Sequence, residues 1–178
     1  MTALRRFLVF QTFMLWQGGF LFYTAFVVPV GTKVLGSGAA QGAITSRVTE
    51  ALNAIGAAGV SLLAWELAVT RDPDRRRTAA RWWCWAVALV CQYLMLVFHE
   101  LLVSFMDPDR RHVVIRPPFY PVHRMYLWAS TVQWLALLPL AWWTLRAWAA
   151  ESASAGLQPA FTPGGATRPE FKPDATAV

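Results

Sequence analysis

Polar side chains capable of chemistry recur at helical spacing inside the most apolar stretches of this sequence. His123, Tyr126, Ser130 and Gln133 stand at positions i, i+3, i+7 and i+10, so on a helix they form one continuous stripe. Ionisable and amide side chains are costly in hydrocarbon, and where they occur they contact protein, water or ligand. The stripe therefore indicates a helix face that is turned toward a partner.

Two further apolar stretches carry comparable stripes. In one of them, Gln92 and His99 are seven residues apart and share a helix face, with Glu100 adjacent. The stripe on the other stretch consists of Glu50, Asn53, Ala57 and Ser61. Each stripe predicts a polar contact between helices.

Helix length brings several of these groups to one end of a predicted bundle. His99 lies 17 residues, about 26 Å, from the inner end of its helix, which places it near the outer membrane boundary. We expect a polar cluster at that boundary, comprising Glu50, Asn53, His99, Glu100, His123, Arg124 and Tyr126. Gln17, Gln92, Ser130 and Gln133 lie deeper, where they could line a path for a polar solute.

Three interpretations of this polar cluster are open. In a structural interpretation, Glu100 pairs with Arg124. His99 then hydrogen-bonds Tyr126 or a backbone carbonyl, and these contacts fix how two helices dock. In a second interpretation, His99, His123 and one of Glu100 or Glu50 bind zinc, copper or iron, because imidazole and carboxylate suit these ions. In a third, His99 and His123 are the axial ligands of a haem between facing helices.

Motifs of the common enzyme classes do not occur in the sequence. It contains no GxSxG, phosphate-binding loop, HExxH or CxxC motif, so it shows no nucleophile or metal centre of those kinds. Cys84 and Cys91 are seven residues apart, about 10 Å along a helix, which is too far for a disulfide between them. The sequence therefore favours a non-enzymatic protein.

The elements that must position these groups are membrane-spanning helices. Of 178 residues, 56% are hydrophobic and 15% are charged, whereas a soluble domain is about 45–50% apolar and about 25% charged. Stretches long and apolar enough for a hydrocarbon core of about 30 Å occur at about 7–30, 51–69, 82–106 and 125–149. We expect an all-α, polytopic transmembrane four-helix bundle over 1–150, followed by a disordered cytoplasmic tail over 151–178.

The second span, 51–69, is expected to be the packing centre of the bundle. Gly56, Gly59 and the neighbouring alanines place small residues at spacings of three and four, which lets neighbouring backbones approach closely. Glu66 lies five residues from Arg71, about 7.5 Å along the helix. We expect Glu66 to reach the inner surface or to pair with an arginine.

Arginine and lysine counts orient the chain in the membrane. Ten lie on the side that holds both termini and the loop between the second and third spans, and six lie on the other side. Cytoplasmic segments carry the excess of these residues, so we predict a multi-pass protein of the cell membrane with both termini cytoplasmic. Tryptophans favour the interface, and the predicted inner interface holds Trp65, Trp82, Trp83, Trp85, Trp142, Trp143 and Trp148.

Two segments of the chain carry a resemblance to a known family. The first, at 16–56, is WQGGFLFYTAFVVPVGTKVLGSGAAQGAITSRVTEALNAIG, and the second, at 119–134, is FYPVHRMYLWASTVQW. They resemble small four-span membrane proteins typified by the eukaryotic transmembrane protein 205, over about residues 7–145. This resemblance implies a four-helix bundle without an assigned reaction. More distantly, the chain is similar to copper-resistance-D-like membrane bundles, which implies that His123 can engage metal or haem.

Two functional hypotheses follow from the sequence. The preferred one is a non-enzymatic integral membrane protein, structural, accessory or transport-associated, with no assigned cofactor. The alternative is a metal- or haem-binding membrane module that uses His99 and His123. The expected partners are the lipid bilayer and a larger membrane complex. Nucleic acid is not expected, because the basic residues stand in short blocks between the spans.

Overall fold

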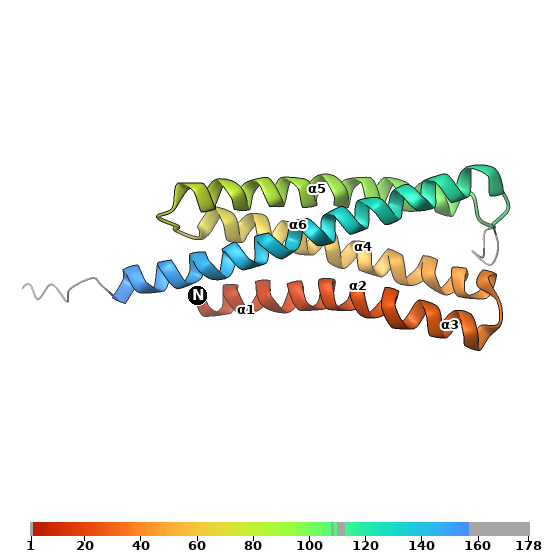
Figure 1. Cartoon of the computed structure of the whole chain (residues 1–178), viewed down its shortest axis with the longest axis horizontal. Helices are drawn as coiled ribbons and strands as arrows, with labels where there is room; N and C mark the ends of the chain where they lie inside the picture. Colours follow the sequence, from red (N-terminus) through yellow and green to blue (C-terminus); the bar gives the residue numbers. More distant parts are fainter. Residues whose placement is uncertain (1, 108, 110–112, 157–178) are drawn as a thin grey trace, which may run out of the picture.

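Four long helices make up the part of the chain that the computed structural model describes, residues 2–107, 109 and 113–156. They lie side by side along one axis (Figure 1). The first runs from Thr2 to Leu35 and comprises α1 (Thr2–Phe13), a π-helical segment (Met14–Gly18), α2 (Gly19–Phe22), a second π-helical segment (Tyr23–Val27) and α3 (Val28–Leu35). The other three are α4 (Gly38–Val69), α5 (Arg75–Ser104) and α6 (Arg116–Gly156).

Two π-helical segments place aromatic side chains of the first helix in the interior. Trp16 lies in the first segment and Tyr23 begins the second, and both are buried although most of their neighbours are exposed. A π turn inserts a residue into the helical repeat and so shifts the face that points inward. The helix ends at Gly36, whose φ of 59° lies in the left-handed region that glycine adopts without strain.

Small residues of α4 receive the Trp16 indole. A Cβ atom on Gly56 would lie 2.9 Å from Trp16 Nε1, and one on Gly59 would lie 2.8 Å from Trp16 Cε3. Both distances are shorter than ordinary carbon contacts of about 3.5–4.0 Å. Gly56 and Gly59 are therefore closely packed, but the atoms nearest to them belong to side chains and not, as predicted, to a neighbouring backbone.

Capping side chains fix where α4 and α5 begin. Ser37 Oγ accepts a hydrogen bond from a backbone N–H in the first turn of α4. Asp74 Oδ1 accepts from the backbone N–H groups of Arg76 and Arg77, at 2.9 and 3.2 Å. Arg77 Nε also donates to Asp72 Oδ2 at 2.6 Å, and this bond lowers the pKa of the Asp72 carboxyl. The loop between α4 and α5 is thereby held to the first turns of α5.

Two apolar clusters form the interior. The larger one takes residues from all four long helices, namely Val9, Trp16, Val60, Leu63, Leu67, Ala88, Leu137 and Leu140. The smaller one lies between α5 and α6 and consists of Met95, Leu102, Tyr126 and Ala129. Large apolar side chains are also exposed along all four helices, with Val34 at 78% and Trp83 at 75%. Contiguous exposure of this kind marks a surface that contacts lipid or protein.

Three of the long helices are long and apolar enough to cross a membrane, namely Thr2–Leu35, Gly38–Val69 and Arg75–Ser104. The all-α prediction is confirmed for the described residues, and these three helices fit the predicted membrane localisation. The helix α6 is not among the three. Its apolar stretch is interrupted by Ser130, Gln133 and four tryptophans between 128 and 143, which lower its mean hydropathy.

The helices extend beyond the predicted spans at both ends of the bundle. The second span was expected from 51, whereas α4 begins at Gly38. The disordered tail was expected from 151, but α6 continues to Gly156, so that boundary is corrected. Contacts with the first helix explain the extension, because Arg6 donates to Glu151 Oε2 at 2.7 Å and to Ser152 Oγ at 3.1 Å. The rest of the predicted tail, 157–178, lies outside the described residues.

Candidate functional site

Buried polar side chains occur at several levels of the bundle. Among the described residues they are Arg5, Gln41, Asn53, Glu66, Thr70, Arg81, Gln92, His99, Ser130, Gln133 and Thr144. A polar group taken out of water is costly unless a partner satisfies it, so each of these side chains requires specific neighbours. Most of them belong to two groups, a charged network at the end of the bundle that is predicted to be the inner one and a layer near the middle of the bundle.

Glu66 of α4 lies at the centre of the charged network. Its side chain is fully buried, and its Oε2 lies 2.8 Å from Arg5 Nε of the first helix. Its Oε1 accepts hydrogen bonds from Trp148 Nε1 of α6 and from Thr70 Oγ1. The predicted pairing of Glu66 with an arginine is confirmed. The partner is Arg5, which lies 61 positions earlier in the sequence.

A second carboxylate, Glu151, extends the network across the end of α6. Arg6 Nη2 lies 2.7 Å from Glu151 Oε2, and Arg5 Nη2 lies 3.5 Å from the same oxygen. The Arg6 guanidinium also lies over the ring of Trp148, at 5.5 Å from its centroid. These contacts join the first helix to the end of α6, where both ends of the described chain lie (Figure 1).

Arg81 of α5 completes the group that we call the inner-end network, which consists of Arg5, Arg6, Glu66, Thr70, Arg81, Thr144, Trp148 and Glu151. Arg81 is 1% exposed, and its Nε donates to Thr144 Oγ1 at 3.3 Å. Its Nη2 has no hydrogen-bond partner among the described residues. The network thus holds three guanidiniums and two carboxylates. Removing each charge from water costs several kcal/mol. Both carboxylates are needed to offset this cost by pairing with the three guanidiniums.

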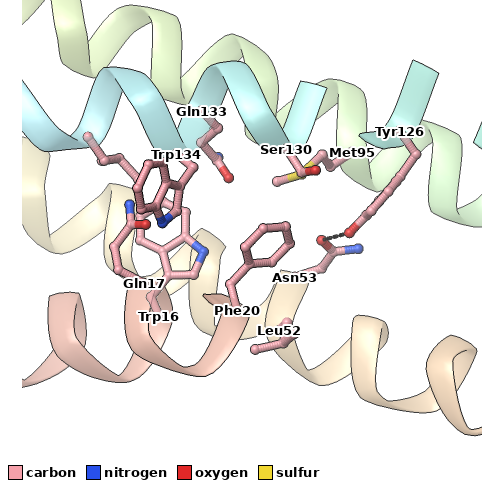
Figure 2. Close-up of a pocket in the computed structure, with 11 residues that line it drawn as sticks. Trp16, Gln17, Phe20, Leu52, Asn53, Met95, Tyr126, Ser130, Gln133 and Trp134 are labelled. Carbon is pink, nitrogen blue, oxygen red and sulfur yellow. Dashed lines mark hydrogen bonds between the residues drawn. The ribbon is translucent and has the colours of Figure 1, made fainter. Parts of the chain in front are cut away.

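The second group, which we call the mid-bundle layer, consists of Gln17, Asn53, Gln92, Tyr126, Ser130 and Gln133. Tyr126 donates its hydroxyl proton to Asn53 Oδ1 at 3.0 Å, as Figure 2 shows. Gln133 Nε2 donates to Gln92 Oε1 at 3.1 Å, and Gln92 Nε2 donates to the backbone oxygen of Asn53 at 3.1 Å. This chain of hydrogen bonds joins α4, α5 and α6.

A small cavity of about 20 Å³ lies within the mid-bundle layer. Trp16, Phe20 and Trp134 form its apolar walls, and Gln17 and Asn53 face it from the first helix and α4 (Figure 2). Asn53 Nδ2 and Gln17 Oε1 are buried and have no hydrogen-bond partner among the described residues. A cavity needs about 10–15 Å³ to hold one water, whereas substrate pockets measure about 300–1,000 Å³. The size and the polar atoms therefore suit one water molecule.

Two members of the predicted outer-end cluster belong instead to the mid-bundle layer. Asn53 and Tyr126 are both buried and bonded to each other. The expected hydrogen bond of His99 to Tyr126 or to a backbone carbonyl stays a prediction, and the Tyr126 hydroxyl donates its proton to Asn53. His99 itself is buried, at 6% exposure, on the face of α5 that also carries Met95 and Leu102. Met95, Leu102 and Tyr126 belong to the apolar cluster between α5 and α6, so His99 lies on the face of α5 that packs against α6.

The charged members of the predicted cluster lie at the surface. Glu50, Glu100 and Arg124 are exposed, and no ion pair joins Glu100 to Arg124 within 4 Å in the described part of the chain. This corrects the predicted link between the two helices. His123 is half-buried and stacks on the Phe119 ring, with 5.8 Å between ring centroids.

The three-ligand metal hypothesis finds no support among the described residues. Residues 2–107, 109 and 113–156 contain no group of three or more His, Cys, Asp or Glu side chains that could hold a metal ion. His99 is buried while Glu100 is exposed, because adjacent residues of a helix point about 100° apart. Haem ligation by His99 and His123 stays a prediction, which a Soret band in the absorption spectrum of the purified protein would test.

Most of the inner-end network was not predicted from the sequence. Arg5 and Arg81 were counted only as charges that set the topology, and Glu151 was placed at the start of the tail. Trp148 was assigned to the lipid interface, whereas its indole donates to Glu66. The available signal was the position of Glu66, a carboxylate within a predicted span that required cationic partners at the same depth.

The fold and the two polar groups define the class of this protein. Its described residues form an all-helical structure in which three helices are long and apolar enough to cross a membrane. Comparison of the chain with protein-family models, with curated proteins and with solved structures found no match. The resemblance to the transmembrane protein 205 family and to copper-resistance-D-like bundles therefore stays a prediction.

Proposed function

We propose that this chain is a four-span integral protein of the cell membrane that serves as a non-enzymatic structural or accessory component. Its fourth span is the stretch 125–149 of α6, which packs against α5 over both apolar clusters. The start of α1, the loop between α4 and α5 and the end of α6 lie at one end (Figure 1). That end carries eight of the twelve arginines and lysines among the described residues, which supports a cytoplasmic location for both termini.

The observation that carries this proposal is the large apolar cluster between the two polar groups. On each long helix, a residue of this cluster separates the inner-end network from the mid-bundle layer. On α6, Leu137 and Leu140 lie between Thr144 and Gln133, which are about 17 Å apart along the helix axis. Both leucines are at most 1% exposed. This packing closes the bundle to water between the two groups, and so favours a structural role over an open path for solutes.

The two polar groups support a structural role because their bonds run between helices. The inner-end network joins all four long helices, and the mid-bundle layer joins α4, α5 and α6. In hydrocarbon such bonds contribute about 0.6–2 kcal/mol each, and they favour one pairing of helices over others. We infer that they set the register of the bundle.

Ion flux into vesicles tests the closed interior. We expect purified protein, reconstituted into vesicles that contain a pH-sensitive dye, to pass protons no faster than vesicles without protein. A double variant, Leu137→Ser with Leu140→Ser, serves as the matched comparison, because it replaces two fully buried residues of the barrier. Proton flux above the protein-free rate in the wild type would overturn the proposal.

Extraction in mild detergent tests the accessory role. We expect the chain to migrate with a larger partner, well above the size of its own 19.9 kDa. Migration as a stable, isolated monomer would contradict the accessory role and leave a structural one.

A further inference from the structure

A basic groove lies at the inner end of the molecule, on the outside of the bundle. Its volume is about 400 Å³, and it runs between the first turns of α5 and the inner part of α6. Its walls include Asp74, Arg76, Arg77, Trp142, Trp143 and Arg146. The volume lies in the range of about 300–1,000 Å³ that small-molecule sites occupy, and none of these residues has a part in the two polar groups described above.

Two of the three arginines in the groove are available to bind an anion. Arg77 is held by Asp72, with 2.6 Å between Nε and Oδ2, and lies 3.9 Å from Asp74. Arg76 and Arg146 are exposed, and neither forms an ion pair within 4 Å with a carboxylate of the described residues. The groove therefore keeps an excess of positive charge near its opening.

The two tryptophans of the groove, Trp142 and Trp143, are residues typical of a membrane interface. Trp142 is 59% exposed, and the Arg146 guanidinium lies 5.8 Å from the centroid of its ring. This contact holds the guanidinium beside an amphipathic indole. Tryptophans favour the level of the lipid headgroups, and on the proposed orientation this end of the bundle meets the cytoplasmic leaflet. The groove is thus placed at the depth of the lipid phosphates.

We propose that this groove binds the headgroup of an anionic phospholipid of the cytoplasmic leaflet, an assignment that rests on the proposed orientation. Arg76 and Arg146 pair with the phosphate oxygens, for which the planar guanidinium fork is well matched. Trp142 and Trp143 cover the glycerol and the start of the acyl chains. A zwitterionic headgroup is disfavoured because its cation would meet the excess arginine charge.

The protein's own tail is a poor competitor for the groove. Residues 157–178 contain two basic and two acidic side chains, so their side-chain charges balance. A neutral segment gains little from a groove with excess positive charge. A lipid headgroup also arrives at the groove already fixed at the correct depth, since its acyl chains hold it in the membrane.

Native mass spectrometry of the full-length protein in detergent tests this lipid site. With phosphatidylglycerol and phosphatidylcholine supplied together at about 0.15 M salt, we expect the wild type to retain phosphatidylglycerol preferentially. The double variant Arg76→Gln with Arg146→Gln should bind phosphatidylglycerol about 30-fold more weakly, from about 1 kcal/mol for each arginine. Both side chains are exposed, so the variant is expected to fold, which circular dichroism checks.

A matched control variant removes the same amount of positive charge from two nearby positions. Arg71→Gln with Arg75→Gln changes two exposed arginines of the same end that do not line the groove. It should weaken phosphatidylglycerol binding less than the groove variant does, because neither side chain lines the groove. Equal retention of both lipids by the wild type, or equal weakening in the two double variants, would overturn the proposal.

A soluble competitor separates a lipid site from a site for free phosphate. We expect glycerol 3-phosphate at the same concentration to leave phosphatidylglycerol bound, and its displacement would overturn the lipid assignment. The measurement is made in detergent and does not depend on orientation in a membrane. A negative result would therefore disprove the lipid site and leave the four-span proposal intact. The four-span proposal is disproved only if the membrane crossings are wrong.

Discussion

Replacing Glu66 by glutamine removes the charge that holds Arg5 in the interior. The Arg5 side chain is 7% exposed, and its Nε lies 2.8 Å from Glu66 Oε2. Removing one partner of a buried ion pair costs about 3–5 kcal/mol, because the other charge is left buried and unpaired. Glu151 remains 3.5 Å from Arg5 Nη2 and offsets part of this cost. We therefore expect Glu66→Gln to lower the free energy of unfolding by about 3 kcal/mol.

Thermal unfolding in detergent, followed by circular dichroism, measures this loss. For a chain of this length, about 3 kcal/mol corresponds to a fall in melting temperature of about 6–12 °C. Glu100→Gln is the matched control, since it makes the same chemical change at an exposed position and should stay within about 0.5 kcal/mol of the wild type. The double variant Arg5→Gln with Glu66→Gln should recover about 0.5–3 kcal/mol relative to the sum of the single changes.

Two results would refute the reasoning. A melting temperature for Glu66→Gln equal to that of Glu100→Gln would mean that the buried charge does not hold the bundle together. Strict additivity of Arg5→Gln and Glu66→Gln would mean that the two side chains do not interact, although 2.8 Å separates their charged atoms.

Three further changes test other contacts by the same melting measurement. Gly56→Ala pushes a methyl group against Gln92 Oε1 and the Trp16 indole and costs about 1–3 kcal/mol. Gly42→Ala, with open space around it, should gain about 0.5–1 kcal/mol; equal effects of the two changes would contradict the packing. Tyr126→Phe leaves a buried amide oxygen without its donor and costs about 1–3 kcal/mol, so an unchanged melting temperature would argue against that hydrogen bond. The bond to Arg77 lowers the pKa of the Asp72 carboxyl in the folded state. The stability that this pair contributes is therefore present above the unfolded-state pKa of about 3.9. It is lost as the pH falls through the folded-state pKa. The difference in melting temperature between the wild type and Arg77→Gln should therefore shrink below about pH 5, and a difference that does not change with pH would contradict the shift.

The helical architecture was largely predictable because it follows from local sequence. Long apolar stretches fix where helices form, and the small residues Gly56 and Gly59 indicated where a neighbour approaches. The ends of the helices were less predictable. The extension of α6 past 151 depends on Arg6 of the first helix, which bonds Glu151, and a contact across 145 positions leaves no local pattern.

The partners within the polar groups were not predictable for a similar reason. Helical spacing identified Asn53 and Tyr126 as side chains that face protein, and both are buried. Spacing alone could not pair them, because the pairing depends on which helices are neighbours and at what depth. The predicted outer-end cluster relied on charged residues near helix ends, and Glu100 and Arg124 proved to be exposed.

The number of membrane crossings is measured most directly by cysteine labelling in intact cells. In a background with Cys84→Ala and Cys91→Ala, single cysteines are introduced by Val114→Cys, between α5 and α6, and by Ser154→Cys, near the end of α6; both positions are exposed. A four-span bundle with cytoplasmic termini predicts that a membrane-impermeant maleimide labels Val114→Cys in intact cells and labels Ser154→Cys only after lysis. Labelling of both positions from the same side would contradict it, because α6 would then not cross the membrane.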